Sequence, residues 1–223
     1  MSGASPTLRI MVNPRQLFLP SGCLPLLDSP LVGEPDAAQA HDGAETTASV
    51  LVLGVGNVLM GDEGVGVQIL RQLELEERIA GVRLLDGGTG GVNLLAEFDG
   101  VAAVILIDAT RDGKPAGTVT YLQPQRVGEL PRGLGAHDFG LKDLFAAAAL
   151  LGRLPDLHLY TIAVEEVRPM CTELSPAVAS AIRPVVASVR VTAAQLANDY
   201  LVRDALSPRK TNAACTSPTD AQP

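Results

Sequence analysis

Apolar and polar positions follow two different periods along the central part of this chain. Residues 50–55 form a continuous apolar run, the pattern of a strand that is buried on both faces of a sheet. Over residues 64–79, apolar side chains recur every three or four positions and acidic ones fall on the opposite side, which predicts an amphipathic helix. Residues 82–85 and 101–107 are predicted strands, and residues 91–98 are a short helix between them.

The second half continues this alternation but adds one strand without a helix before it. A turn is predicted at residues 111–117, followed by a strand at 118–122. This connection is too short for a helical crossover, so we expect the fourth strand to run antiparallel to the third. An Ala- and Leu-rich helix at 140–151 and a fifth strand at 158–164 follow.

A long final helix completes the pattern. Ser175 is a favourable N-cap and Pro176 suits the first helical position, and the helix is predicted to run toward Leu201. Pro184 predicts a kink or a break inside it. The order β-α-β-α-β-β-α-β-α is typical of an α/β fold. We expect a three-layer sandwich, in which a twisted, mostly parallel five-stranded sheet with one antiparallel pair carries helices on both faces.

Both ends of the chain differ from this central part. Residues 1–48 are rich in proline and polar residues, and residues 207–223 are polar as well. Such segments bury too little apolar surface to offset the entropy that is lost on ordering. We therefore predict an irregular N-terminal extension over 1–48, one α/β domain over 49–206 and a disordered tail over 207–223.

Composition narrows the possible functions. The 223 residues carry a formal net charge of −8, and 47% of them are hydrophobic, which is enough for a sizeable core. The acidic balance disfavours nucleic acid, which binds a basic face, and anionic membrane surfaces. No apolar run reaches the about 18 residues that a membrane-spanning helix needs. We therefore expect neither nucleic acid nor a membrane as a partner.

The cysteines and the first residues indicate a compartment. Cys23, Cys171 and Cys215 are far apart, which favours reduced thiols in a cytosolic protein over a disulfide framework. Pro20 and Pro25 interrupt the apolar stretch near the N-terminus, so we expect no cleaved signal peptide. These patterns predict a cytoplasmic location.

Acidic residues follow three of the predicted strands. Asp62 and Glu63 lie in the loop after the first strand, Asp86 follows the second and Asp108 follows the third. Ligands of open α/β sheets bind beyond the carboxyl ends of the strands. Because no basic residue stands beside these carboxylates in the sequence, the pattern favours a cation site over a phosphate site.

Each acid also has a purely structural interpretation. Asp62 or Glu63 can cap a helix, Asp86 can begin a turn, and Asp108 can cap the turn after its strand. Capping explains one member of the first pair, but not the glycines and the asparagine around it, which tolerate the unusual backbone of a tight loop. The joint placement of these acids at one sheet edge favours a functional role.

The glycines of the first loop permit a nucleotide-binding interpretation. Gly54-Val-Gly56 begins like the dinucleotide-binding pattern G-x-G-x-x-G, but Leu59 stands at the position of the third glycine. Acidic residues then precede the helix, where a pyrophosphate needs bare backbone N–H groups. A nucleotide-dependent oxidoreductase is therefore a weak alternative, and we predict no nucleotide-binding residues.

One of the three histidines is a candidate metal ligand. His41 lies in the polar N-terminal segment, and His158 lies in a predicted strand, where a core or edge position is expected. His137 lies in a glycine-flanked loop before a helix, and this loop is long enough to reach the acids. Acid and imidazole ligands with an open position are typical of a catalytic metal site, and Zn²⁺ or Ni²⁺ suits such a set.

Four motifs resemble the hydrogenase maturation proteases. They are Gly54-Val-Gly-Asn-Val-Leu-Met-Gly-Asp-Glu-Gly-Val-Gly66, Asp86-Gly-Gly-Thr89, Ile107-Asp-Ala109 and Ala136-His-Asp-Phe-Gly140. The resemblance covers roughly residues 50–190. It implies a twisted sheet between helices and an endopeptidase, classed with the aspartyl peptidases. Such an enzyme trims the C-terminal extension of a [NiFe]-hydrogenase large-subunit precursor after nickel insertion.

The resemblance also implies roles for individual residues. The metal-binding positions of the family correspond to Glu63, Asp108 and His137, and the nickel would arrive with the precursor. We consider Asp86 a candidate general base as well. The substrate-recognition loop of the family corresponds to Asp86, Gly87, Gly88, Thr89 and Gly90.

Two rival functions use the same features. The three ligands would also serve a non-catalytic nickel-binding or metallochaperone module in hydrogenase assembly. A similar sheet serves metal-dependent peptidases with other substrates, since a fold alone does not decide function. Cys171 has no histidine near it in the sequence, so we interpret it as an inert thiol rather than a nucleophile.

Overall fold

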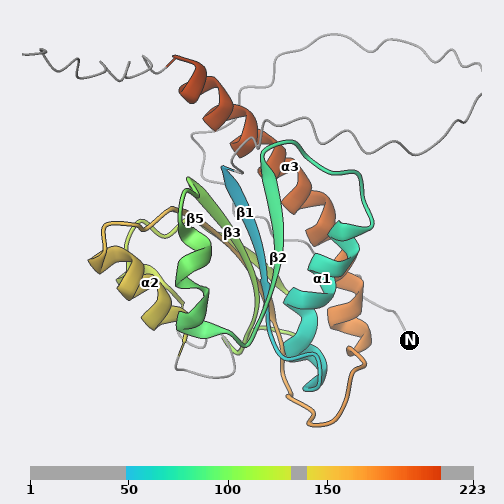
Figure 1. Cartoon of the computed structure of the whole chain (residues 1–223). Coiled ribbons are helices and arrows are strands. Elements are labelled where there is room, and N and C mark those ends of the chain that lie inside the picture. The colour runs from blue at the N-terminus through green and yellow to red at the C-terminus, as the bar shows by residue number, and fades with distance from the viewer. Residues whose placement is uncertain (1–48, 132–139, 207–223) are drawn as a thin grey trace, which may run out of the picture.

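The computed structural model of the chain describes residues 49–131 and 140–206 (Figure 1). The predicted N-terminal extension and C-terminal tail lie outside the described residues, and so does the segment 132–139, which contains His137. The described part forms an α/β fold in which the elements follow the predicted order.

A five-stranded sheet forms the centre, with the strand order β2-β1-β3-β5-β4. Its strands are β1 (Val50–Val55), β2 (Val82–Gly88), β3 (Ala103–Thr110), β4 (Val119–Leu122) and β5 (Asp156–Ala163). The first three and β5 run parallel, and β4 pairs antiparallel with β5. The predicted mixed sheet is confirmed. β4 runs opposite to β3, as predicted, but it takes its hydrogen bonds from β5, which lies between them.

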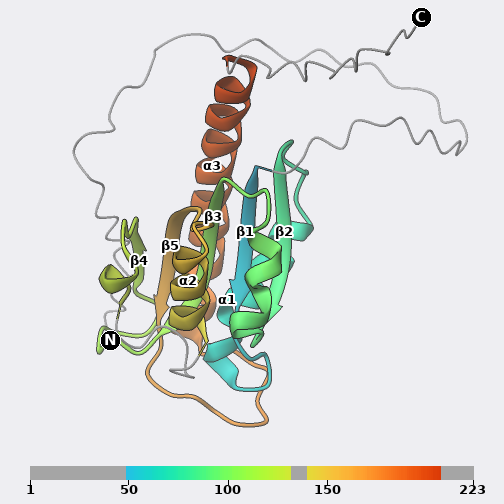
Figure 2. The same cartoon turned by 60° about the vertical axis from the view of Figure 1, so that its left-hand side comes forward.

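Helices cover both faces of the sheet (Figures 1 and 2). On one face lie α1 (Val65–Glu74) and α3 (Pro176–Leu206), and on the other lie the 3-10 helix η2 (Gly91–Phe98) and α2 (Leu141–Leu150). Two shorter 3-10 turns are η1 (Gly61–Gly64) and η3 (Val127–Glu129). The predicted three-layer sandwich is therefore confirmed.

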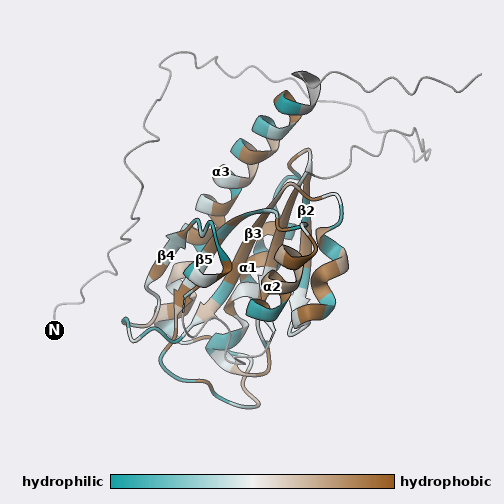
Figure 3. Ribbon diagram, turned by 90° about the vertical axis from the view of Figure 1, so that its left-hand side faces the viewer, coloured by the Kyte–Doolittle hydropathy of each residue, from teal (hydrophilic) through white to brown (hydrophobic). Residues whose placement is uncertain are grey.

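The central strands are continuous apolar runs because both of their sides are buried. In β1, Val50 and Val52 belong to the core under α1 and α3, whereas Leu51 and Leu53 belong to the core under η2 and α2. Figure 3 shows the strands in the middle of the sheet as mostly brown, hydrophobic ribbons. Full burial of each such side chain contributes about 1.5–3 kcal/mol, so these two layers hold the sheet between its helices.

α1 ends at Glu74, whereas the amphipathic pattern predicted a helix to residue 79. Glu74, Glu76 and Glu77 place negative charge at the carboxyl end of the helix, where the helix dipole opposes it. Arg190 of α3 holds the following segment by donating to the Glu77 carbonyl oxygen at 3.0 Å. The chain can therefore turn into β2 without a longer helix.

α3 begins where the sequence predicted. The Val178 N–H donates to Ser175 Oγ at 3.4 Å, and Pro176 is the first helical residue. The helix then continues through Pro184 without the predicted break. Pro184 is exposed, so the carbonyl group that loses its helical hydrogen bond can face water.

α3 combines length with an apolar composition. Within the described residues, it is the one helix that is long and apolar enough to cross a membrane by those two criteria alone. Its buried side chains, which include Val178, Val185 and Val189, pack on the sheet. We therefore interpret α3 as a core helix, whose end extends beyond the sheet at the top of Figure 1.

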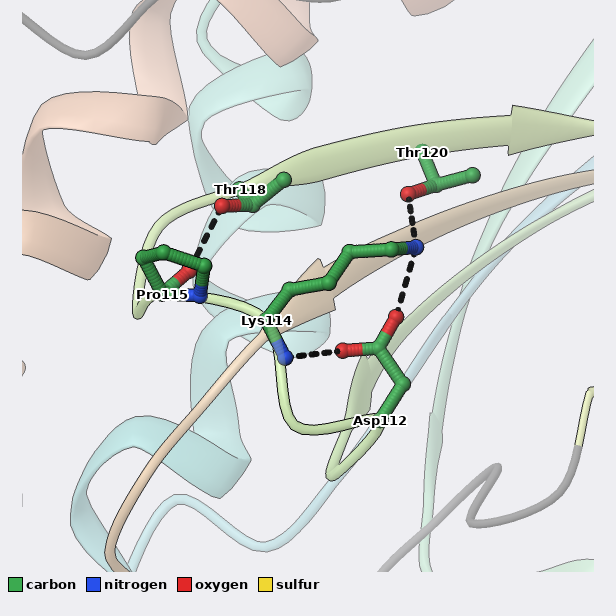
Figure 4. Close-up of polar contacts among 5 residues, drawn as sticks. All are labelled: Asp112, Lys114, Pro115, Thr118 and Thr120. Atoms are coloured by element: carbon green, nitrogen blue, oxygen red, sulfur yellow. Dashed lines mark hydrogen bonds and ion pairs between the residues drawn. The ribbon is translucent and has the colours of Figure 1, made fainter.

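The turn between β3 and β4 lies where the sequence predicted (Figure 4). The Lys114 N–H donates to Asp112 Oδ1 at 3.1 Å, and Lys114 Nζ lies 2.7 Å from Asp112 Oδ2 and 3.0 Å from Thr120 Oγ1. Thr118 Oγ1 donates to the Pro115 carbonyl oxygen at 2.6 Å. These bonds reverse the chain directly after β3, so β4 can run antiparallel to β5.

Candidate active site

The carboxyl ends of the four parallel strands meet at one edge of the sheet, at the lower end of Figure 1. Three segments gather there: the loop and 3-10 turn after β1, the end of β2 with residues 86–90, and the loop 164–175 between β5 and α3. The first and last of these, cyan and orange, lie side by side in Figures 1 and 2. Open α/β sheets bind their ligands at this edge.

Glycines let the first loop pack directly on the strand ends. A Cβ atom on Gly56 would lie 2.0 Å from the Glu63 carbonyl oxygen, and one on Gly66 would lie 2.4 Å from the Ile107 carbonyl oxygen. Gly56 and Gly61 also have positive φ angles, 139° and 62°, which residues with side chains rarely adopt. The predicted tight loop is confirmed. Gly56 lets the loop after β1 lie against η1, and Gly66, the second residue of α1, lets this helix begin close to β1 and β3.

Glu63 and Asp108 are both buried at this edge. Glu63 in η1 is 3% exposed and Asp108 in β3 is 0% exposed. Because η1 contacts β3, two separate segments bring these acids to the same end of the sheet. The prediction that Asp108 follows the strand is wrong. β3 continues to Thr110, because its pairing with β5 extends through Asp108 and Thr161.

Asp62, the neighbour of Glu63, has a structural role. Its side chain is 5% exposed, and Oδ1 accepts a hydrogen bond from the Ser175 N–H at 2.6 Å. Asp62 thus satisfies a backbone donor at the start of α3, rather than capping the helix that follows it in the sequence. The expectation that Asp62 caps the helix after the first loop is therefore wrong, because its contact lies at the start of α3 and neither η1 nor α1 has a side-chain hydrogen bond at its N-cap.

Asp86 occupies a more open environment. It lies inside β2, so the prediction that it follows the strand is wrong. The ladder with β1 continues through Asp86 opposite Gly54 and, after a bulge, through Gly88 opposite Val55. The side chain is exposed, Oδ1 accepts from the Gly88 N–H at 2.9 Å, and Oδ2 lies 3.9 Å from Arg71 Nη2. The predicted turn-forming role is confirmed, and the exposed ion pair adds little stability.

The rest of the predicted recognition loop, residues 87–90, forms a compact turn. The Gly90 N–H donates to the Gly87 carbonyl oxygen at 2.8 Å. The Gly56 N–H donates to the Gly88 carbonyl oxygen at 2.9 Å. This second bond ties the turn to the loop that carries Glu63, so Asp86 and the first loop share one local framework. Thr89 lies at the tip of this turn.

The third predicted ligand, His137, lies outside the described residues. Gly140, which follows that segment, lies against Gly91, since a Cβ atom on Gly91 would be 3.2 Å from Gly140 Cα. The segment therefore rejoins the described structure beside residues 86–90. Within residues 49–131 and 140–206, no cluster of three His, Cys, Asp or Glu side chains could hold a metal ion. The ligand set of Glu63, Asp108 and His137 thus stays a prediction.

His158 is a buried residue of β5, as predicted, and lies away from this edge. Its Nδ1 atom lies 2.6 Å from Tyr121 Oη and 3.1 Å from Gln123 Nε2. Burial lowers the pKa of His158 and raises the pKa of Tyr121. The geometry fits a neutral imidazole whose Nδ1 accepts a hydrogen bond from the Tyr121 hydroxyl, with the Gln123 amide sharing the same lone pair at the longer distance, and this links β4 to β5.

The loop 164–175 is the part of the edge that sequence reasoning missed. Met60 pairs with Cys171 in a parallel bridge, and Gln68 Nε2 donates to the Thr172 carbonyl oxygen at 3.2 Å. The Cys171 thiol is half-buried and donates to the Glu173 carbonyl oxygen at 3.6 Å, in keeping with the predicted inert thiol. The loop has no periodicity of its own, so only contacts between distant segments reveal its place.

Known proteins share this sequence pattern. A sequence model of the hydrogenase maturation protease family matches residues 67–191, more than half of the chain. The chain is 33% identical over 161 residues to the hydrogenase 2 maturation protease of Escherichia coli, which covers 70% of this chain and 98% of that protein. It is 35% identical over 165 residues to the hydrogenase expression/formation protein HoxM of Azotobacter vinelandii, covering 65% of this chain and 78% of that one.

Solved structures agree with this likeness. The hydrogenase maturating endopeptidase HybD from Escherichia coli superposes with a TM-score of 0.57 at 33% identity, over 63% of this chain and 88% of that one. The [NiFe] hydrogenase maturation protease HybD from Thermococcus kodakarensis gives a TM-score of 0.55 at 29% identity, over 65% and 98%. These likenesses favour a peptidase over the non-catalytic alternative. The chain belongs to the hydrogenase maturation protease family and is a peptidase.

Proposed function

We propose that this chain removes the C-terminal extension of a [NiFe]-hydrogenase large-subunit precursor after nickel insertion. The observation that carries the proposal is the placement of Glu63 and Asp108, both buried, at the ligand-binding edge of the sheet. Carboxylates kept at such an edge present negative charge to whatever binds there, which favours a cation as part of the ligand. A precursor that carries its nickel provides that cation.

The nickel in this proposal is part of the substrate. Glu63 and Asp108 offer oxygen ligands and His137 would offer an imidazole nitrogen, a donor set that suits a borderline divalent ion. Recognition of the ion restricts cleavage to loaded precursors. The ion itself would orient the scissile bond and polarise a carbonyl group or a water molecule.

Asp86 is the proposed general base. Its carboxylate is exposed at the same edge, and the Gly88 N–H fixes its orientation. A carboxylate held within reach of water can take the proton of an attacking water molecule. The loop from Asp86 to Gly90, which is bonded to the first loop through Gly56, is proposed to hold the precursor segment. If Asp86→Asn cleaved the precursor at the wild-type rate, the base would have to be sought elsewhere.

The test is cleavage of purified large-subunit precursors, with and without loaded nickel, followed by intact mass. We expect loss of a short C-terminal peptide from the loaded precursor only. Glu63→Ala, Asp108→Ala and His137→Ala should each prevent that loss while the variants stay folded by circular dichroism. Cleavage that ignores the nickel would refute the recognition role of the three residues.

The same preparation tests the metallochaperone alternative and the compartment. Stoichiometric nickel binding by the isolated chain in equilibrium dialysis, together with no cleavage, would favour the nickel-binding module. We propose a cytoplasmic location, which the free thiol of Cys171 supports. Fractionation of cells into cytoplasm and periplasm checks it. We propose no nucleic-acid or membrane partner.

A further inference from the structure

Two large apolar side chains project into solvent beside the candidate active site. Leu59, in the first loop, is 52% exposed, and Met170, in the loop 164–175, is 89% exposed. The two loops run next to each other at the lower end of the fold in Figures 1 and 2. Because Met60 pairs with Cys171 in parallel register, Leu59 and Met170 precede the pair on neighbouring strands of backbone.

Backbone hydrogen bonds hold these loop tips in place. The Gly61 N–H donates to the Cys171 carbonyl oxygen at 2.7 Å, and the Cys171 N–H donates to the Leu59 carbonyl oxygen at 3.1 Å. The Arg168 N–H donates to the Met60 carbonyl oxygen at 3.3 Å. The exposed side chains are therefore mounted on a hydrogen-bonded framework rather than on independent loops.

The backbone of Met170 carries strain. Its φ angle is 58°, and it is the one non-glycine residue with positive φ within residues 49–131 and 140–206. Residues other than glycine, asparagine and aspartate rarely adopt this conformation, and such strain clusters at functional sites where the surroundings impose it. Since the side chain is almost fully exposed, packing within the fold does not explain why methionine stands here.

Leu59 is presented by a defined turn. Its N–H donates to Asn57 Oδ1 at 3.0 Å, and the Met60 N–H donates to the Asn57 carbonyl oxygen at 3.0 Å. Only four positions separate Leu59 from Glu63 in the same loop. The leucine thus has a fixed position relative to the buried acid.

We propose that Leu59 and Met170 form an apolar docking contact for the large-subunit precursor. This inference rests on the proposed function, because the precursor must approach this edge to reach Glu63 and Asp108. The occupant is an apolar segment of the precursor near the scissile bond. Leucine offers a rigid apolar surface, and methionine adapts its shape to a partner. Their continuity with the loop that carries Glu63 favours the precursor over an unrelated partner.

The test compares Leu59→Ser and Met170→Asn with a matched control. Asparagine tolerates the positive φ angle, so Met170→Asn removes the apolar side chain without adding strain. Leu150→Asn is the control, because Leu150 is 88% exposed and lies at the end of α2, toward the opposite edge of the sheet. We expect the KM for loaded precursor to rise about tenfold or more in each test variant, with kcat nearly unchanged. The control should match the wild type.

The outcomes separate this inference from the proposed function. If the wild-type chain cleaves no precursor, the proposed function fails, and the docking contact fails with it. If the wild type cleaves and both test variants keep its KM, the docking contact alone is wrong. A wild-type chain that self-associates in sedimentation, and loses this association in Met170→Asn with an unchanged KM, would assign the surface to a second copy and overturn the inference.

Discussion

Two parts of this molecule bury polar side chains, and they do so in different ways. Around His158, groups from neighbouring strands bind one another, because Tyr121 and Gln123 both contact one nitrogen of the imidazole. At the carboxyl edge, Glu63 and Asp108 are brought to the same end of the sheet by a loop that packs on the strands through glycines. The first group of side chains joins β4 to β5, and the second lies where the sheet meets the loops.

The difference teaches that burial of a titratable group does not by itself identify a functional site. His158 and Tyr121 have shifted pKa values for the same reason, burial, and yet they join two strands. Glu63 stands out because of its place at the carboxyl edge and because the backbone around it is specialised for close approach. Substitution of the buried acid Glu63 should therefore lower activity, whereas substitution of His158 should leave activity unchanged.

The largest expected effect is on cleavage by Glu63→Gln. This change replaces the carboxyl group of a buried side chain by an amide with little change in shape. We expect the rate of precursor cleavage to fall about a hundredfold or more, while thermal unfolding stays cooperative. The rate is measured on nickel-loaded precursor by intact mass. His158→Gln is the matched control, and it should cleave at the wild-type rate. Equal losses in both variants would remove the distinction between the two regions.

A large effect on stability is expected from Gly66→Ala. The added Cβ atom would meet the carbonyl oxygens of Val55 and Ile107 at 2.3 and 2.4 Å, and backbone atoms cannot move aside easily. We expect a loss of about 3 kcal/mol in the free energy of unfolding, at the upper end of the cost of overpacking. Urea unfolding measures it. Gly128→Ala is the control, because its Cβ atom would meet nothing within 4 Å. A stable Gly66→Ala would mean that the start of α1 does not need its close approach to β1 and β3.

Asp62→Ala should have a smaller effect on stability. The change leaves the Ser175 N–H without the carboxylate oxygen that it contacts at 2.6 Å. Loss of a partner for a fully buried donor costs about 1–3 kcal/mol, and because this contact is part-buried we expect a loss at the lower end of that range. Urea unfolding again gives the value, and Asp62→Asn, which keeps an acceptor oxygen, should recover part of it. If both the alanine and the asparagine variant were as stable as the wild type, the contact between Asp62 and Ser175 would not anchor α3.

Most of the fold could be predicted from the sequence, since apolar runs and stripes report burial directly. The strands 50–55 and 118–122 and the start of the last helix at Ser175 follow from local patterns. The ends of β2 and β3 do not follow from local patterns. Pairing with the neighbouring strand extends β2 beyond Asp86 to Gly88 and β3 beyond Asp108 to Thr110. Local propensity also predicted a break at Pro184. The helix continues through this proline because it lies on the exposed side of α3.

The candidate site was predicted in part. Its acids could be found because they follow apolar runs whose carboxyl ends must meet at one edge. Two contacts at this edge could not be found in the sequence: the one between Asp62 and Ser175, and the bridge between Met60 and Cys171. Each joins residues that are more than a hundred positions apart. Such contacts depend on how the helices return to the sheet, which no local pattern encodes.

The smallest expected effect is a pH dependence from His158. Burial lowers its pKa in the folded protein below the ordinary value of 6.5. As the pH falls below 6.5, the unfolded chain takes up the proton first, so the folded state loses stability until the pH reaches the folded pKa. The slope from one proton is at most about 1.4 kcal/mol per pH unit. Above this window the group contributes its full stability.

His158→Gln isolates this contribution, because the glutamine oxygen can accept from Tyr121 but does not titrate. Urea unfolding of both proteins between pH 5 and 8 should show a steeper loss in the wild type below about pH 6.5. The difference between the two proteins should stay constant above that pH. Cleavage should not follow this titration, because His158 lies away from the carboxyl edge. Parallel stability curves would show that His158 is protonated equally in the folded and unfolded states, and the structural link between β4 and β5 would then not depend on a neutral imidazole.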